Sequence, residues 1–349
     1  MKKFDELSEH ITEDEYRNNG RFHYSDIAGY LRNGFSGLTK KDKEDSDSIM
    51  FGSLVDCLVT QGRDEFDKRY TPSIVSDLSD NQKSVTKALV ELGYESFDEV
   101  NGSVVIDLLD EMDLYRKFRP ETRILKILGE CGDYFKFLVD SKGKIVVSQD
   151  MYNDALDLAD ILVGSKNTST FFDSGLNDGL DRYFQLKFNG TYNNIPITCM
   201  VDETIVDHEN RKVWLVDLKT TSSGYEYEFP KSFVKWRYDI QCRMYSYIVR
   251  QVMDSDSFYK DYELCGFIFV YASRTNKTPL IWTFDNIADR DPIEIGNMSL
   301  SDFTEPLKEI RDIVEKKLVM PEWISIDGAN DIIFGLNKFY KNENKDKTI

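Results

Sequence analysis

The chain has 349 residues, an apolar content of 41% and a formal net charge of −18 at pH 7. This length is enough for one large domain or two smaller ones with a packed core. The negative charge argues against a broadly basic, histone-like nucleic-acid binder, but an enzyme can offset it with a metal ion and a local basic patch.

The sequence shows no sign of a membrane or of an oxidising compartment. No apolar run approaches the roughly 18 residues of a membrane helix, and the first 20 residues are polar and acidic, without an apolar signal region. The five cysteines are scattered and contain no C-x-x-C pair, so they predict neither disulfides nor a thiolate zinc or iron–sulfur site. We therefore expect a cytoplasmic protein whose cysteines lie in the core.

Two helices are predicted in the first 60 residues. Ile27 begins a helical pattern for which Ser25 is a suitable N-cap. The run from Met50 to Val59 is predicted to be a helix buried on most sides, and Asp56 is an acid within this apolar run.

Residues 61–142 carry no recognisable catalytic motif. Helical patterns occur at 80–93, 105–118 and 121–140. The run Tyr115–Arg119 mixes aromatic and basic residues. This run is typical either of a patch that faces DNA or of a helix face that packs on the core and keeps the charged ends of its basic side chains in water. We favour the second interpretation.

Strand and helix patterns alternate after residue 142. Residues 143–150 predict a strand followed by a helix with Ser148 as its cap. The alternating run at 181–190 predicts a strand that carries Gln185. Two further strands are expected at 266–272 and 279–284, and an amphipathic helix at 297–318.

The stretch 195–221 combines apolar strands with acids. The apolar run Ile197–Val206 carries Asp202, and after a polar turn a second apolar run carries Asp217 and ends at Lys219. This pattern predicts a β-hairpin, on which Asp217 and Lys219 share one face. Charges in apolar strands must be paired or bind a metal. A divalent cation between the two acids is the simplest arrangement, and a surface ion pair on an edge strand is the alternative.

A helix is predicted from about Ser232 to Val252. Tyr238, Gln241 and Tyr245 follow at i, i+3 and i+7, so they lie on one face of it. Basic residues outnumber acids here, in contrast to the whole chain. The sequence has no Walker A or G-x-G-x-x-G motif, and its three histidines argue against a histidine-based nuclease or a zinc hydrolase.

The order of these segments resembles a known family. Asp202 on a strand precedes Asp217-Leu218-Lys219-Thr220-Thr221, and the helix with Tyr238, Gln241 and Tyr245 follows. This order resembles the PD-(D/E)XK nuclease superfamily, and more narrowly its phage-type RecE (exodeoxyribonuclease VIII-like) branch. The resemblance covers most of residues 24–285, with a poorly matched stretch between about 72 and 140.

The resemblance implies an α/β (α+β) fold with a restriction-endonuclease-like core, in which helices flank a mixed central β-sheet, and with a helical insertion. We expect a single PD-(D/E)XK nuclease domain over residues 1–349. Its core would lie at about 24–60 and 143–285, its mostly helical insertion at about 61–142 and a C-terminal helical segment at about 295–340.

The resemblance also implies a site for one or two Mg²⁺ or Mn²⁺ ions. The expected ligands are the carboxylates of Asp202 and Asp217 and the carbonyl of Leu218, because hard cations prefer oxygen. Asp56 stands where the family usually has a histidine. It is either a further ligand, or it pairs with a core arginine or caps a neighbouring element. Gln185 lies near a position where many relatives carry glutamate.

Site roles follow from the same match. The expected catalytic residues are Asp202, Asp217, Lys219, Gln241 and Tyr245. Lys219 would orient or help to deprotonate the attacking water and offset developing charge, while Gln241 and Tyr245 would position the water, Lys219 or a phosphate. The expected DNA-binding residues are Thr220, Thr221, Lys235, Arg237, Tyr238 and Arg243.

The resemblance predicts a metal-dependent DNA exonuclease that hydrolyses phosphodiester bonds, on double-stranded ends in phage-type recombination or repair. The alternatives are a catalytically inactive DNA-binding or scaffold protein of the same fold, an endonuclease, or a nuclease that acts on RNA. The expected partners are DNA, a single-strand annealing protein and further copies of the chain. The expected location is the host cytoplasm if the protein is phage-encoded.

Overall fold

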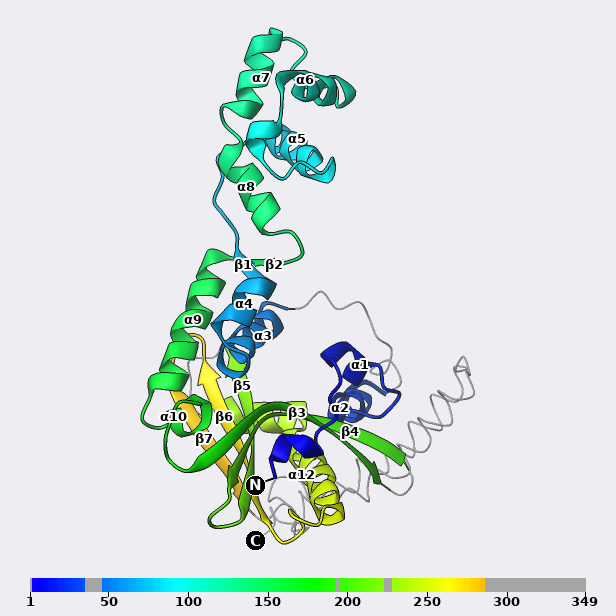
Figure 1. Ribbon diagram of the computed structural model, residues 1–349, viewed down its shortest axis with the longest axis vertical. Helices are drawn as coiled ribbons and strands as arrows, with labels where there is room; N and C mark the ends of the chain where they lie inside the picture. Colours follow the sequence, from blue (N-terminus) through cyan, green and yellow to red (C-terminus); the bar gives the residue numbers. More distant parts are fainter. Residues whose placement is uncertain (1, 35–45, 193–194, 223–227, 286–349) are drawn as a thin grey trace, which may run out of the picture. The chain divides into compact units, whose positions relative to one another are not determined.

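The computed structural model describes residues 2–34, 46–192, 195–222 and 228–285 (Figure 1). The chain divides into two compact units, one formed by Met1–Thr60 with Leu158–Ile349 and the other by Gln61–Asp157. Within the described ranges, no helix has the length and apolar character that a membrane crossing requires. The C-terminal helical segment expected at about 295–340 lies outside the described residues, and the single nuclease domain stays a prediction.

The first unit contains a five-stranded mixed sheet in the order β3-β4-β5-β6-β7. Its neighbours are antiparallel except for β5 and β6, which are parallel. The predicted mixed sheet flanked by helices is therefore confirmed. The strands are β3 (Leu180–Tyr192), β4 (Ile195–Asp207), β5 (Lys212–Thr221), β6 (Glu263–Ser273) and β7 (Pro279–Asp285).

The predicted hairpin is formed by β4 and β5. Their ladder pairs Val206 with Val213 and Asp207 with Lys212 around a short turn. Asn210 in that turn donates backbone and side-chain hydrogen bonds to the Asp207 carboxylate, which fixes the turn locally.

The crossover from β5 to β6 contains two helices where the sequence predicted one. They are α11 (Glu228–Trp236) and α12 (Tyr238–Ser255). Arg237 between them has a left-handed backbone with φ of 59°, which interrupts the run of helical hydrogen bonds. Its guanidinium donates to both carboxylate oxygens of Asp239 at 2.8 and 2.7 Å, so the side chains hold this break in place.

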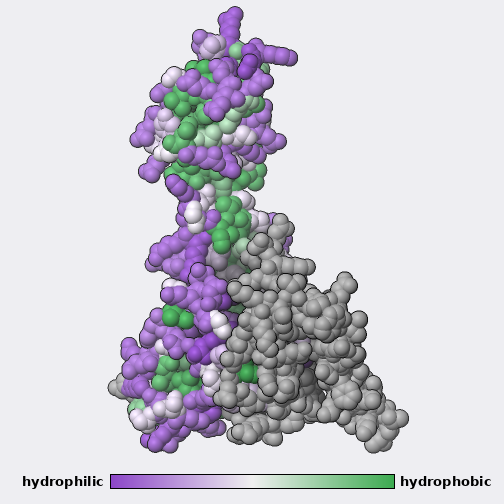
Figure 2. Space-filling view, turned by 90° about the vertical axis from the view of Figure 1, so that its right-hand side faces the viewer, coloured by the Kyte–Doolittle hydropathy of each residue, from purple (hydrophilic) through white to green (hydrophobic). Residues whose placement is uncertain are grey.

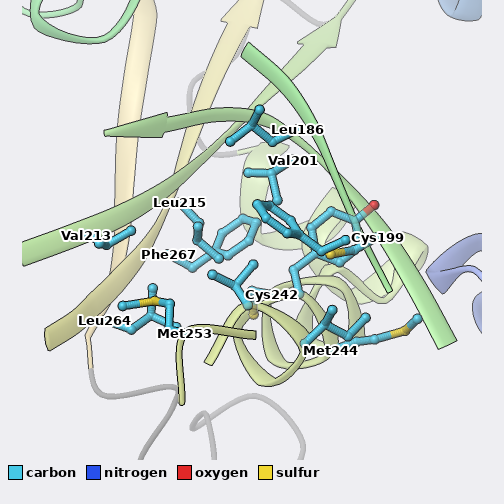
Figure 3. Packing of buried hydrophobic residues seen from close by; sticks show 14 of the residues in the cluster. Leu186, Cys199, Val201, Val213, Leu215, Cys242, Met244, Met253, Leu264 and Phe267 are labelled. Carbon is cyan, nitrogen blue, oxygen red and sulfur yellow. The ribbon is translucent and has the colours of Figure 1, made fainter. Parts of the chain in front are cut away.

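Helix α12 covers one face of the sheet and carries the main core. Its Cys242, Met244 and Met253 side chains lie against strand residues such as Val201 and Phe267 (Figure 3). All five side chains are at most 1% exposed. Burying a large apolar side chain of this kind contributes about 1.5–3 kcal/mol, so this interface is a main source of the unit's stability.

Of the three N-terminal segments, the first contacts β3 and the third contacts α12. They are η1 (Phe4–Leu7), α1 (Glu13–Arg17) and α2 (Tyr24–Asn33). The Phe4 ring is fully buried and lies 4.9 Å from the Tyr259 ring, centroid to centroid. Helix α2 begins one residue before the predicted N-cap Ser25, because the Asp26 carboxylate accepts the backbone N–H of His23 at 2.9 Å.

Helix α3 (Asp47–Thr60) contacts β4 and β5. At Gly52, a β-carbon would lie only 3.0 Å from the Thr220 hydroxyl oxygen, so the absence of a side chain allows this close approach. The same helix carries Asp56 one turn further on. Asp56 is thereby brought near the strands that carry the other candidate ligands.

The second unit is mostly helical. Its helices are α4 (Arg63–Arg69), α5 (Asp80–Glu91), α6 (Gly102–Glu111), α7 (Pro120–Leu128) and α8 (Gly132–Asp140), and β1 (Tyr70–Pro72) pairs in parallel with β2 (Ile145–Val147). The helix predicted at 121–140 is two helices, because the chain turns at 129–131. Helix α9 (Gln149–Gly164) continues from this unit into the first, and Ser148 caps it as predicted, by accepting the Met151 N–H.

This unit has its own core and some apolar surface. Val85, Leu89, Val105, Leu109 and Ile127 are fully buried. Figure 2 shows apolar residues among polar ones on the surface of its upper part, where α5 to α8 lie. The separate core means that the unit does not depend on the sheet for its hydrophobic burial.

Candidate active site

The β4–β5 hairpin brings Asp202 and Asp217 together. The ladder pairs Glu203 with Val216, so the next positions along it are Asp202 and Asp217 on neighbouring strands. The Asp202 carboxylate accepts the backbone N–H of Leu218 at 3.0 Å, which binds it to the partner strand. Asp217 is only 2% exposed. Two carboxylates from one hairpin therefore lie next to each other in a buried site.

Two further predicted residues contact Asp217. The Gln241 side-chain amide, from α12, donates to one Asp217 oxygen at 2.5 Å and is itself buried. The Lys219 ammonium forms an ion pair with the other oxygen, Oδ2. The strand spacing and the helix face predicted from the sequence thus meet at one carboxylate.

Aromatic rings surround the Lys219 ammonium. It lies 4.9 Å from the ring centroid of Tyr238 and 6.0 Å from that of Phe269. The Tyr24 ring, from α2, lies 6.5 Å from the Tyr238 ring. Aromatic faces attract cations, so these rings hold the ammonium beside Asp217. Tyr24 and Phe269 were not predicted, because no motif in the sequence links them to Lys219.

The electrostatics follow from this burial. Burial raises the pKa of Asp202 well above its usual value, and the charges of Asp217 and Asp56 add to the shift. Burial also raises the pKa of Asp217, although Lys219 and Gln241 oppose it. Burial alone would lower the pKa of Lys219, but Asp217 first and then Tyr238 reverse the direction, so the pKa of Lys219 is raised.

Lys219 is consequently a cation at neutral pH. A lysine with a raised pKa is a poor proton acceptor, so its side chain suits charge stabilisation and orientation better than deprotonation of a water. The two acids act on each other unequally in this poorly solvated site: the charge of Asp217 raises the pKa of Asp202, whereas a side-chain hydrogen bond from Asp202 lowers the pKa of Asp217. A further positive charge would favour their ionised forms.

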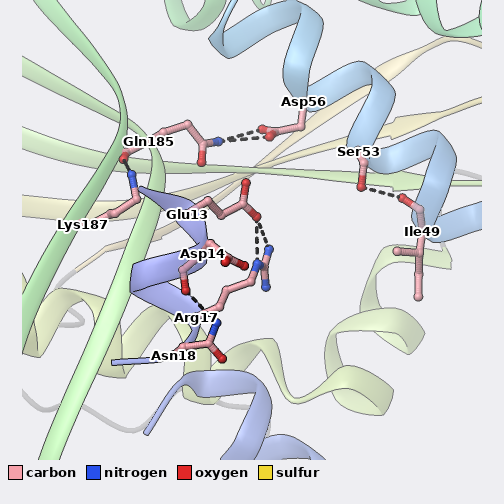
Figure 4. Close-up of polar contacts among 9 residues, drawn as sticks. All are labelled: Glu13, Asp14, Arg17, Asn18, Ile49, Ser53, Asp56, Gln185 and Lys187. Carbon is pink, nitrogen blue, oxygen red and sulfur yellow. Dashed lines mark hydrogen bonds and ion pairs between the residues drawn. The ribbon is translucent and has the colours of Figure 1, made fainter. Parts of the chain in front are cut away.

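Asp56 lies at the edge of this group and is bound by Gln185. The Gln185 amide nitrogen donates to both Asp56 oxygens at 3.1 Å (Figure 4). Gln185 has a φ of 55° within β3, and the β3–β4 ladder has no pair there, between Phe184↔Glu203 and Leu186↔Val201. This irregularity in the strand gives Gln185 its contact with α3.

The donor set suits a hard divalent cation. Asp202 and Asp217 offer carboxylates and Leu218 a carbonyl, and Mg²⁺ is usually held by one or two carboxylates together with water and substrate phosphate. Gln241 Oε1 is also buried without a hydrogen-bond partner among the described residues. In the described part of the chain no group of three His, Cys, Asp or Glu side chains surrounds a common metal position. Asp56 would therefore have to leave Gln185 to become a third ligand.

The other predicted residues divide by exposure. Tyr245 is buried in the core, with its ring 6.2 Å from that of Phe267. Arg237 and Arg243 are each 9% exposed and are not presented at the surface. Lys235 is exposed, whereas Thr220, Thr221 and Tyr238 are half-buried. Among the expected DNA-binding residues, these last four are the accessible ones.

Comparisons with known proteins give little beyond the fold. No family model and no curated protein matches the chain. One solved structure with a similar fold is a crystal structure from Eubacterium rectale described as a "putative exonuclease", with a TM-score of 0.42 and 14% identity over 80% of this chain and 79% of that one. We therefore base the function on the site residues.

Proposed function

We propose that this chain is a metal-dependent deoxyribonuclease of the PD-(D/E)XK type, and specifically an exonuclease that acts on double-stranded DNA ends in phage-type recombination or repair. The observation that carries the proposal is the convergence on Asp217: Gln241 donates to one of its oxygens, Lys219 pairs with the other, and Asp202 lies on the neighbouring strand. A surface ion pair on an edge strand would not be 2% exposed or bound by a helix residue.

The chemistry assigns each residue a task. Asp202, Asp217 and the Leu218 carbonyl would hold Mg²⁺ or Mn²⁺, which supplies an acidified water and charge stabilisation when bound. Lys219 stays protonated and stabilises the negative charge that develops on the phosphate. Gln241 fixes the orientation of Asp217 through its hydrogen bond. A single-strand annealing protein and further copies of the chain as partners are part of the same proposal and derive from the family resemblance alone.

A nuclease assay tests the reaction. The full chain is incubated with linear and covalently closed duplex DNA in Mg²⁺, Mn²⁺ or EDTA. We expect metal-dependent loss of linear DNA, reduced at least about 100-fold in Lys219→Ala and Asp217→Asn and unchanged in Lys136→Ala, which removes an exposed lysine of the second unit. Cleavage of closed circles would instead identify an endonuclease.

Metal binding has a readout that does not need activity. Asp202→Asn keeps an oxygen that can accept the Leu218 N–H but removes one ligand charge, so this variant should fold. Mg²⁺ or Mn²⁺ should raise the melting temperature of the wild-type protein and not that of Asp202→Asn. Equal shifts in both proteins would place the metal elsewhere.

A non-catalytic DNA-binding protein is the second candidate. It is favoured by Asp56, whose two oxygens are both bound by the Gln185 amide. If the chain binds DNA but hydrolyses neither DNA nor RNA in either metal, this second function replaces the first.

A further inference from the structure

Trp236, the last residue of α11, is an exposed aromatic residue that contacts two cations. The residue as a whole is 40% exposed. The Arg32 guanidinium carbon lies 4.8 Å from the ring centroid, and the Lys235 ammonium lies 4.7 Å from it. Arg32 comes from α2, so this cluster joins two segments that are about 200 residues apart in the sequence.

Contacts with α2 fix the position of Trp236. The Tyr24 hydroxyl donates to the Trp236 carbonyl at 2.5 Å. The Tyr24 ring in turn lies 6.5 Å from the Tyr238 ring, and the Lys219 ammonium lies 4.9 Å from that ring's centroid. Burial raises the pKa of Tyr24, and Lys219 and Arg32 are both close enough to oppose this shift. The cluster is therefore next to the candidate active site.

Among the described residues, the two cations have no acidic partner. In the described part of the chain, neither Arg32 nor Lys235 forms an ion pair with a carboxylate, although acids outnumber bases by 62 to 44 in the sequence. A cation–π contact at an exposed site is weak, about 0.5–1 kcal/mol. Within the described ranges, these two charges lie beside an exposed ring without a carboxylate partner in an acidic chain, which favours an anionic ligand with an aromatic part.

We propose that Trp236, Arg32 and Lys235 bind one nucleotide of an unpaired DNA strand, with its base stacked on Trp236 and its phosphates on the two cations. The proposal rests on the proposed nuclease function and narrows its substrate to DNA with single-stranded or frayed ends, because a base must leave its duplex to stack on a side chain. Lys235 has a long and exposed side chain. It can move off the Trp236 ring, so that the base stacks there, and bind the adjoining phosphate.

Oligonucleotide binding in EDTA tests the site without any cleavage. The probe is a fluorescently labelled single-stranded DNA titrated with the full chain. Stacking is worth about 1–3 kcal/mol per base, and about 1.4 kcal/mol is a factor of ten, so Trp236→Ala should weaken binding roughly 5- to 150-fold. Trp236→Phe should bind nearly as the wild type does. Arg32→Ala should weaken binding and lower its salt dependence.

The second unit offers a matched control. Phe118 is also an exposed aromatic residue, and the Lys126 ammonium lies 5.4 Å from its ring centroid. Phe118→Ala should leave oligonucleotide binding unchanged. If Phe118→Ala weakens oligonucleotide binding as much as Trp236→Ala does, the assignment of the binding site to Trp236 is overturned. The aromatic–basic run Tyr115–Arg119 would then be the candidate DNA-binding surface.

An abasic probe separates stacking from charge. The wild-type protein should bind an oligonucleotide without bases over the bound segment as weakly as Trp236→Ala binds intact DNA. The affinity of Trp236→Ala for this abasic oligonucleotide should be no lower than that of the wild type. The proposal is overturned if the wild-type protein binds intact and abasic DNA equally well, or if Trp236→Ala binds intact DNA with the affinity of the wild type. It is also overturned if the protein does not bind single-stranded DNA. Binding with these properties but without hydrolysis would refute only the nuclease function.

Discussion

At the scale of single residues, the buried acid Glu203 is outside the proposed chemistry. It follows Asp202 on β4, is fully buried, and neither of its carboxylate oxygens has a hydrogen-bond partner among the described residues. Burial raises the pKa of Glu203 well above its ordinary value of 4.5, and Arg182 only partly opposes this. Between pH 4.5 and its raised pKa, Glu203 is therefore protonated in the folded protein.

This burial predicts a pH-dependent stability. In the unfolded chain Glu203 ionises above about pH 4.5, while in the folded chain it stays protonated to higher pH. Its contribution to stability is thus full below pH 4.5 and falls, by up to about 1.4 kcal/mol per pH unit, as the pH rises toward the folded pKa. Glu203→Gln should remove this loss, so its stability relative to the wild type should improve between pH 5 and pH 8.

Urea unfolding at the two pH values measures the effect. Glu209→Gln, which changes an exposed glutamate on the same hairpin, is the control and should show the same difference from the wild type at both values. If the difference in stability between Glu203→Gln and the wild type is also the same at pH 5 and pH 8, Glu203 is ionised in the folded protein.

At the scale of elements, the distance between α3 and β5 is set at Gly52. Glycine in a helix costs about 1 kcal/mol relative to alanine, yet an added β-carbon would lie 3.0 Å from the Thr220 hydroxyl oxygen. Helix propensity and close packing therefore act in opposite directions at this position.

A double-mutant cycle separates the two effects. Gly52→Ala should gain little or lose stability in the wild-type protein, because the Thr220 hydroxyl must move. In a Thr220→Ala background the same change should stabilise by about 1 kcal/mol. Denaturant unfolding of the four proteins gives the coupling. Equal effects of Gly52→Ala in both backgrounds would show that Thr220 does not limit this contact.

At the scale of the whole molecule, each of the two compact units has a hydrophobic cluster of its own among the described residues. One lies between α12 and the sheet and the other among α5 to α8, and each belongs to one compact unit. Units with separate cores can unfold separately, so a single free energy of unfolding does not describe such a chain.

Two matched substitutions test this independence. Leu109 in the second unit and Leu215 in the first are both fully buried. Leu→Ala at a buried position costs about 2–5 kcal/mol. In calorimetry, Leu109→Ala should lower only one of two transitions and Leu215→Ala only the other. One transition shifted by both substitutions would show that the units unfold together.

The sequence by itself predicted the parts of the site that lie within one element or its neighbour. The spacing of Asp217 and Lys219 places them on one strand face, the short turn specifies the hairpin with Asp202, and the helical period places Gln241 on the face of α12 that meets Asp217. Which residues share a face depends only on the two-residue period of a strand and the 3.6-residue period of a helix, so the sequence pattern was sufficient to predict these positions.

Only the tertiary structure decided the rest. Arg237 was expected at a surface, but its pair with Asp239 and its left-handed backbone bury it at a helix break. The contact of Gln185 with Asp56 joins residues 129 positions apart, and that of Tyr24 with Trp236 joins residues 212 apart. Such contacts depend on how helices pack on the sheet, and no local period encodes that packing.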